Sequence, residues 1–211
     1  MSFARRALER LGSIHGRTVH SRRVHALASH FAELIPPRHS VLDVGCGDGL
    51  IDQLLLERRP DLRVAGLETL VRPGAPIPVM SFDGRRLPCA DKSWDTVMFC
   101  DVLHHAEDPV GMLREAARVA RHSVMIKDHL ADGVAARWLL RFMDFVGNAP
   151  HGVALPYNYF DRAQWTSAYQ SSDLIPAETR TRLALYPSWA DPIFGRSLHF
   201  ISRCEMNQSP G

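Results

Sequence analysis

Three glycines fall within five positions of the stretch VLDVGCGDGL (residues 41–50), directly after an apolar run. Gly45, Gly47 and Gly49 permit a tight backbone turn, and the helical pattern that follows would present its unpaired N–H groups to a ligand. Asp43 adds a carboxylate just before the turn. This charge would repel a pyrophosphate and attract an ammonium group. The stretch therefore predicts a site for a nucleoside that carries positively charged groups.

Histidines and an aspartate follow two later apolar runs. His104 and His105 come shortly after the run that ends at residue 100, and Asp128 and His129 follow the next run. Imidazole can take a proton from a hydroxyl group or a carbon acid near neutral pH. We therefore regard His105 and His129 as candidate bases and Asp128 as a candidate catalytic residue. One of the paired histidines could instead pack on the ligand, and Asp128 could cap a helix.

Short apolar runs alternate with helical patterns between residues 39 and 128. The expected strands are 40–44, 62–68, 77–83, 95–101 and 122–128, and the expected helices are 50–59 and 108–120. This alternation indicates βαβ units, and hence a parallel sheet that is covered on both faces. The histidines would then lie at the carboxyl ends of the fourth and fifth strands, which is where ligands bind in such sheets.

Helical and strand patterns also occupy both ends of the chain. An amphipathic helix is expected over 24–35, where Pro36 and Pro37 stop it, and two more are expected over 133–148 and 161–173. Residues 179–187 and 195–205 alternate like strands. Too little chain separates these two strands for a helical crossover, so we expect them to pair antiparallel.

The segment VLDVGCGDG resembles the first motif of the class I S-adenosylmethionine-dependent methyltransferases, in particular type 11-like enzymes that act on small molecules. The likeness continues through SFDGRRLPCADKSWDTVMFCDVLHHAEDP and covers about residues 40–128, roughly two-fifths of the chain. It implies a three-layer α/β Rossmann-like fold. Its seven-stranded, mostly parallel sheet would have the order 3-2-1-4-5-7-6, with the last strand antiparallel. Residues 1–211 would form one domain, with an N-terminal helical lid (1–38), a cofactor-binding half (39–128) and an acceptor-side half (129–211).

The same resemblance assigns residues to the cofactor, S-adenosylmethionine, whose product is S-adenosylhomocysteine. Glu68, 25 positions after Asp43, would bridge the ribose hydroxyls, and Asp83 would accept from the adenine amino group. The full cofactor set is Asp43, Gly45, Cys46, Gly47, Glu68, Thr69, Asp83, Gly84, Asp101, Val102 and His104. In this fold the insert before the sixth strand shapes the acceptor pocket, which points to Asp144, Asn148, His151, Tyr157 and Tyr159. These five residues could equally be solvated turn formers.

Methyl transfer to an oxygen, carbon or nitrogen atom of a small molecule is the expected function. The segment Asp101-Val102-Leu103-His104 is not the Asn/Asp-Pro-Pro-Tyr that similar enzymes use for planar amino groups, and no pair of glutamates flanks the fourth strand. One alternative is a non-catalytic accessory protein that binds the same cofactor. Another is a nicotinamide-dependent oxidoreductase, against which stand Asp43 and a third glycine that comes one residue too early for the dinucleotide pattern.

The bulk composition of the 211 residues is that of an ordinary globular protein, with 45% hydrophobic and 23% charged residues. Residues 1–40 hold seven arginines against two glutamates, and we interpret them as a solvated helix face. The four cysteines show no metal-ligand spacing, and the histidines at positions 15, 20, 25 and 30 would be scattered around a helix axis, so we expect no metal. We expect a cytoplasmic monomer or homodimer that binds neither nucleic acid nor membrane.

Overall fold

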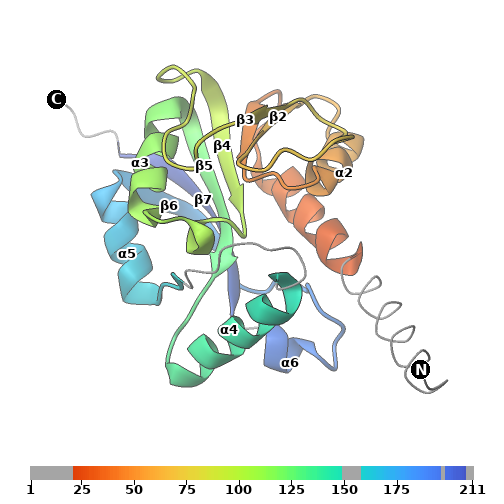
Figure 1. Cartoon of the computed structure of the whole chain (residues 1–211), viewed down its shortest axis with the longest axis vertical. Coiled ribbons are helices and arrows are strands. Elements are labelled where there is room, and N and C mark those ends of the chain that lie inside the picture. The colour runs from red at the N-terminus through yellow and green to blue at the C-terminus, as the bar shows by residue number, and fades with distance from the viewer. Residues whose placement is uncertain (1–20, 149–157, 196–197, 208–211) are drawn as a thin grey trace.

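A single seven-stranded sheet forms the centre of the computed structural model, which describes residues 21–148, 158–195 and 198–207 (Figure 1). Its strand order is β3-β2-β1-β4-β5-β7-β6, which confirms the order that the resemblance implied. Strand β7 pairs antiparallel with both β5 and β6, whereas the other pairs are parallel. The strands are β1 (Ser40–Val44), β2 (Arg63–Glu68), β3 (Val79–Ser81), β4 (Trp94–Cys100), β5 (Ala120–His129), β6 (Leu174–Arg180) and β7 (His199–Met206).

The helices begin at residues whose side chains or backbone favour a helix start. Asp108 caps α3 by accepting a hydrogen bond from the Gly111 N–H at 2.8 Å, and Asp161 forms a capping box with Gln164 at the start of α5. Residues 21–34 form a further helix. The remaining bounds are α2 (Leu50–Arg58), the short 3₁₀ helix η1 (Leu103–His105), α3 (Pro109–Val119), α4 (Val134–Asn148), α5 (Arg162–Ser171) and α6 (Asp191–Phe194).

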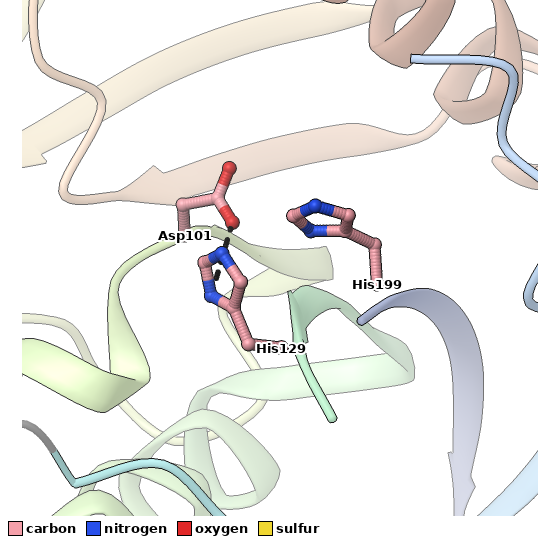
Figure 2. A group of neighbouring side chains, drawn as sticks. All are labelled: Asp101, His129 and His199. Atoms are coloured by element: carbon pink, nitrogen blue, oxygen red, sulfur yellow. Dashed lines mark ion pairs between the residues drawn. The ribbon is translucent and has the colours of Figure 1, made fainter. Parts of the chain in front are cut away.

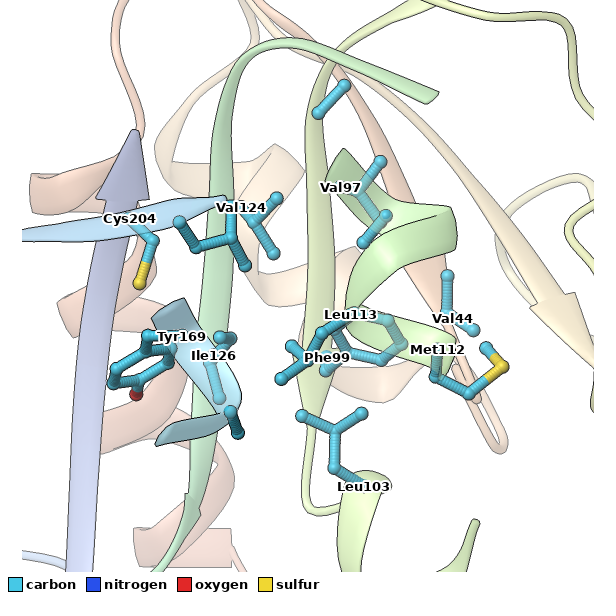
Figure 3. Close-up of a cluster of buried hydrophobic side chains, with 14 of the residues drawn as sticks. Val44, Val97, Phe99, Leu103, Met112, Leu113, Val124, Ile126, Tyr169 and Cys204 are labelled. Atoms are coloured by element: carbon cyan, nitrogen blue, oxygen red, sulfur yellow. The ribbon is translucent and has the colours of Figure 1, made fainter. Parts of the chain in front are cut away.

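Two apolar clusters lie on opposite faces of the sheet, because neighbouring residues of a strand point in opposite directions. In β4, Val97 and Phe99 join the cluster that α3 and α5 cover, which Figure 3 shows. Met98, between them, joins the second cluster, which is covered by α2 and by the helix of residues 21–34. The result is the expected three-layer α/β architecture. Among the described residues, no helix is both long enough and apolar enough to cross a membrane.

The position predicted for the sixth strand was wrong. Strand β6 is Leu174–Arg180 instead of residues 179–187. It contains Pro176, which an edge strand tolerates, and its register shifts between Pro176 and Glu178. The alternation at Leu183 and Leu185 has a different cause, since both side chains are buried in the cluster beside the helix of residues 21–34.

The N-terminal helix lies in the layer beside α2, where Leu27 and Phe31 are buried in the second cluster. Residues 1–20 fall outside the described part of the chain. A lid over the cofactor therefore stays a prediction.

Candidate active site

The predicted cofactor residues line one edge of the sheet. Glu68 is the last residue of β2, Asp101 follows the last residue of β4, and Asp83 lies two residues beyond β3. These strands are parallel, so their carboxyl ends meet at the same edge. The glycine turn after β1 lies between the ends of β2 and β4.

The glycine turn is held by backbone hydrogen bonds and needs residues without side chains. Gly45 has φ +77° and donates its N–H to the Leu67 carbonyl at 2.7 Å; a Cβ there would lie 2.5 Å from Val102 Cγ2. Gly47 has φ +61°, and a Cβ built on it would meet nothing within 4 Å. Gly45 therefore allows close packing against the β4 loop, while Gly47 borders open space at the sheet edge.

Glu68 links the glycine turn to the end of β2. One carboxylate oxygen accepts a hydrogen bond from the Gly47 N–H at 2.9 Å, and the other accepts from the Thr69 N–H at 2.8 Å. This carboxylate is therefore fixed by backbone donors that come from two loops. Thr69 in turn lies beside Gly84, since a Cβ at Gly84 would lie 3.2 Å from Thr69 Cγ2.

Asp83 is exposed and closes its own turn. Its Oδ1 accepts hydrogen bonds from the Arg85 N–H at 2.8 Å and the Arg86 N–H at 2.9 Å. These two bonds lower the pKa of Asp83. The side chain is thus an oriented carboxylate next to Gly84, whose φ is +76°.

Asp128, at the carboxyl end of β5, is the centre of a buried network. Its oxygens accept hydrogen bonds from the Leu103 N–H at 3.1 Å, the His129 N–H at 2.7 Å and the His104 ring Nδ1 at 2.7 Å. Burial alone would raise the pKa of Asp128, but the attraction of His104 and the hydrogen bonds outweigh it and hold the pKa well below its usual range. Asp128 is therefore a carboxylate that fixes the ring of His104.

Aromatic rings surround His104, which is 3% exposed. Tyr159 stacks on it with ring centroids 5.2 Å apart, His105 lies at 4.0 Å, and His129 meets it edge-on at 4.6 Å. The Tyr159 hydroxyl donates to the Leu140 carbonyl at 3.3 Å, which ties α4 to this cluster. The hydrogen bond to Asp128 and the stacked ring of Tyr159 thus hold the His104 ring in one orientation.

His129 is a weak base in this setting. Its ring Nδ1 lies 3.2 Å from Asp128, and its carbonyl accepts from the Trp165 indole N–H at 3.0 Å. Burial, together with the charge of Lys127, lowers the pKa of His129 to about 4. His129 is therefore neutral at pH 7.

Asp101 forms a second charged group with Arg23 and Lys127, and both cations donate hydrogen bonds to its carboxylate. The Lys127 ammonium is fully buried and also lies 3.2 Å from the Nδ1 of His199, whose Nε2 lies 3.0 Å from the Phe194 carbonyl oxygen. Burial would raise the pKa of Asp101, but Arg23 and Lys127 hold it well below its usual range.

Asp101, His129 and His199 point toward one another, as Figure 2 shows, and their ligand atoms lie within 4.8 Å of each other. That spacing would suit a metal ion. In this protein, Lys127 donates to both Asp101 and His199 and so already places a positive charge between them.

Residues 42–126 match a family model described as a methyltransferase domain. A methyltransferase in complex with the Trm112 methyltransferase activator of Haloferax volcanii shares 15% identity over 92% of this chain and 93% of that chain, with a TM-score of 0.66. The S-adenosylmethionine-dependent methyltransferase of Mesorhizobium loti shares 15% identity over 84% of this chain and 96% of its own, with a TM-score of 0.62. The mitomycin 7-O-methyltransferase MmcR shares 18% over 87% of this chain and 53% of its own, with a TM-score of 0.61. The curated protein sequences give no match.

The chain has the class I methyltransferase fold. The matched segment begins at Leu42 in β1 and ends at Ile126 in β5, and thus spans the glycine turn and the ends of four parallel strands. The family model and this fold agree with the resemblance, whose expected cofactor is S-adenosylmethionine.

The residues at the glycine turn fit such a cofactor. Gly47 borders open space, and the Asp43 Oδ1 is buried with no hydrogen-bond partner among the described residues. A ligand with a cationic amino group would supply that missing partner. In the methyltransferase fold, the turn of residues 45–47, the Glu68–Thr69 pair and the Asp83–Gly84 pair would hold the cofactor, and their individual roles stay predictions.

Part of the predicted acceptor pocket can be placed. Tyr159 lies in the histidine cluster. Asp144 and Asn148 lie in the last two turns of α4, but their side chains are outside the described part of the structure. His151 and Tyr157 are outside it entirely.

Three residues of this edge were missed by the sequence analysis: Arg23, Lys127 and His199. The interpretation of the basic first segment as a solvated face is wrong for Arg23, whose side chain is only 24% exposed and binds Asp101. Lys127 carried a signal, because a lysine interrupts the buried run of β5. His199 begins β7 and showed no comparable signal.

Proposed function

We propose that the protein transfers a methyl group from S-adenosylmethionine to an oxygen or carbon atom of a small-molecule acceptor. The observation that carries this proposal is the buried pair of His104 and Asp128 at the carboxyl ends of β4 and β5. The bound cofactor supplies an electrophilic methyl group. The chain must align the acceptor, exclude water and, for an acceptor that carries a proton, remove that proton.

The geometry favours His104 as the base over His105 and His129, the candidates that sequence alone suggested. Asp128 orients His104 through Nδ1 and would stabilise the imidazolium that forms when Nε2 takes a proton. His129 fits this role less well because burial and Lys127 lower its pKa to about 4. A base is most effective when its pKa is near the working pH.

A small-molecule acceptor agrees with the neighbour MmcR, whose name describes O-methylation of mitomycin. We place the acceptor beside Tyr159 and His104, because η1 and β5 bring these rings together at the sheet edge.

Binding and transfer assays test this function. S-adenosylhomocysteine should raise the melting temperature of the purified protein, while NAD should not. The protein is then added, with methyl-labelled S-adenosylmethionine, to the low-molecular-mass fraction of a cell extract. Label should appear in a metabolite. Absence of any S-adenosylhomocysteine effect would overturn the proposed cofactor site.

A non-catalytic accessory protein is the second candidate. The methyltransferase of the Trm112 complex assembles with an activator protein. In this case S-adenosylhomocysteine would still stabilise the protein, but label would not move to any small molecule. Label would move only to the substrate of a separate, co-purified partner enzyme.

A further inference from the structure

Two buried aspartates face the same space between β1 and α2. In β1, Leu42 and Val44 point into the cluster covered by α3, so Asp43 points to the opposite face, which α2 covers. Asp52 is the third residue of α2 and is 0% exposed, and Asp43 is 2% exposed. The two side chains are near enough to hydrogen-bond when one of them carries a proton.

Within residues 21–148, 158–195 and 198–207, no cation neutralises this pair. The titratable groups that act on the two carboxyls are Cys46 and Asp48 of the glycine turn, Glu68 of β2 and Cys100 of β4, and none is a cation. Neither oxygen of Asp52, nor the Oδ1 of Asp43, has a hydrogen-bond partner among the described residues. Two buried carboxylates without partners cannot both remain ionised. A proton held between the two carboxyls removes one of the two negative charges and supplies a hydrogen bond between them.

We propose that Asp43 and Asp52 share one proton in the ligand-free protein and release it when the cationic aminoacyl end of the cofactor binds, so that Asp52 sets the pH dependence of cofactor affinity. This inference rests on the proposed cofactor site. Asp52 acts through Asp43 and is a positioning residue, because its side chain is fully buried, whereas Gly47 borders open space.

The neighbouring carboxylate of Glu68 is less suited to bind the cationic group of the cofactor. Both oxygens of Glu68 already accept backbone hydrogen bonds, from Gly47 and Thr69. Asp43 retains a buried oxygen without a partner at the entrance of the turn. An ammonium group placed there would offset the repulsion between the two carboxylates and so lower the pKa of both, and the shared proton would then leave to solvent.

The pH range of the effect follows from the direction of the shift. Burial is the main cause that raises the pKa of both carboxyls, and it raises that of Asp52 to about 7. Below this pH, each ligand that binds must displace a proton. The affinity should therefore rise by up to about tenfold per pH unit as the pH increases toward 7, and it should level off above.

Titration calorimetry with S-adenosylhomocysteine tests the proposal without any enzymatic assay. Binding is measured between pH 5.5 and 8 in pairs of buffers with different ionisation enthalpies, which counts the protons released. The wild-type protein should release close to one proton at the acid end of this range, and the number released should fall as the pH rises through about 7. Asp52→Asn supplies a permanent N–H donor to Asp43, so it should release no proton and bind with an affinity that does not change with pH.

Glu57→Gln is the matched control, because Glu57 lies on the same helix as Asp52 but is exposed. It should keep the wild-type proton release, and any titration of the ligand itself would appear equally in both variants. Binding by the wild type without proton release would overturn the proposal, whether or not Asp52→Asn folds. The proposal would also be overturned if the folded Asp52→Asn variant released as many protons as the wild-type protein. Absence of binding at every pH would overturn the proposed cofactor site, and this inference with it.

Discussion

Asp43 and Asp128 are equally buried, at 2% and 1% exposure, yet their pKa values move in opposite directions. Asp43 lies on the cofactor side of the sheet edge, where the nearby charged groups are other carboxylates. Asp128 lies on the acceptor side, where it binds His104 and two backbone N–H groups. A buried carboxyl therefore behaves according to the donors that face it and not according to its burial alone.

The difference divides the sheet edge into two halves, which we name by their strands and not by the expected division of the chain at residue 129: the cofactor half at β1 and β2, and the acceptor half at β4, β5 and β7. On the cofactor half, β1, β2 and α2 gather Asp43, Asp52 and Glu68, and the excess negative charge suits a cationic ligand. On the acceptor half, β4, β5 and β7 gather Asp101 and Asp128 with their own cations and imidazoles. The first half is thus prepared for a ligand, whereas the second is already neutralised and can serve as a fixed site for proton transfer.

The largest expected effect is on the acceptor half. His104→Ala should lower turnover by about 10²–10⁴-fold, the usual contribution of a positioned base. If His104 acts as a base and not as the cofactor contact that the resemblance assigns to it, S-adenosylhomocysteine affinity should stay unchanged. The measurement is steady-state transfer to the acceptor that the label experiment identifies. His122→Ala is the control, since His122 is exposed at the opposite edge of the sheet. Equal activity of both variants would contradict the assignment of His104.

The next largest expected effect is a loss of stability when the charge pair of the acceptor half is broken. Asp101→Asn keeps the shape of the side chain and tolerates its φ of +59°, but it leaves the buried Lys127 without its carboxylate. We expect the free energy of unfolding to fall by about 3–5 kcal/mol in urea denaturation. Adding Lys127→Met should recover part of that loss. Asp91→Asn removes an exposed partner of Arg118 and should cost at most about 1 kcal/mol. Similar losses for the two single variants would show that the acceptor half is not held by this charge pair.

The positions of the cofactor-half residues at the sheet edge were predictable from the sequence, because local order sets them. Asp43, Glu68 and Asp83 each lie within two residues of the carboxyl end of a strand, and a parallel sheet brings these strand ends to one edge. The strand order was available only through the resemblance. The βαβ pattern therefore predicted a parallel sheet covered by helices, because such units have few possible arrangements.

The acceptor half was less predictable because its contacts join distant parts of the chain. Arg23 is 78 residues from Asp101, and Lys127 is 72 residues from His199. These pairs depend on where the first helix packs and on the insertion of β7 beside β5, which no local pattern specifies. Sequence named both His104 and Asp128 but gave them separate roles. Their pairing depends on the alignment of η1 with the end of β5.

A smaller effect, on cofactor affinity, is expected when Glu68 is replaced, the residue that joins the glycine turn to β2. Glu68→Ala removes the acceptor for the Gly47 N–H and the proposed ribose contact. It should weaken S-adenosylhomocysteine binding by about 1–3 kcal/mol, measured by calorimetry. Turnover at saturating cofactor should change little, because the acceptor half is untouched. Glu57→Ala, an exposed change on α2, should bind as the wild type does. Unchanged affinity of Glu68→Ala would place the cofactor elsewhere.

The smallest expected effect concerns stability without ligand and tests the cofactor half by itself. Burial raises the pKa of Asp52 to about 7, whereas an unfolded aspartate titrates near its ordinary value of about 3.9. Between these values the folded protein binds more protons than the unfolded chain, so this group makes the free energy of unfolding decrease as the pH rises.

Asp52→Asn lacks the titration, so its stability relative to the wild type should increase between pH 5 and 8. The slope cannot exceed about 1.4 kcal/mol per pH unit for a single proton. Urea denaturation of both proteins across this range measures the difference, in which the titrations of all other groups cancel. Asp128→Asn should show no such gain, because Asp128 has a depressed pKa and is ionised throughout the range. Parallel stability curves for Asp52→Asn and the wild type would mean that the cofactor half holds no shared proton and that its carboxyls resemble those of the acceptor half.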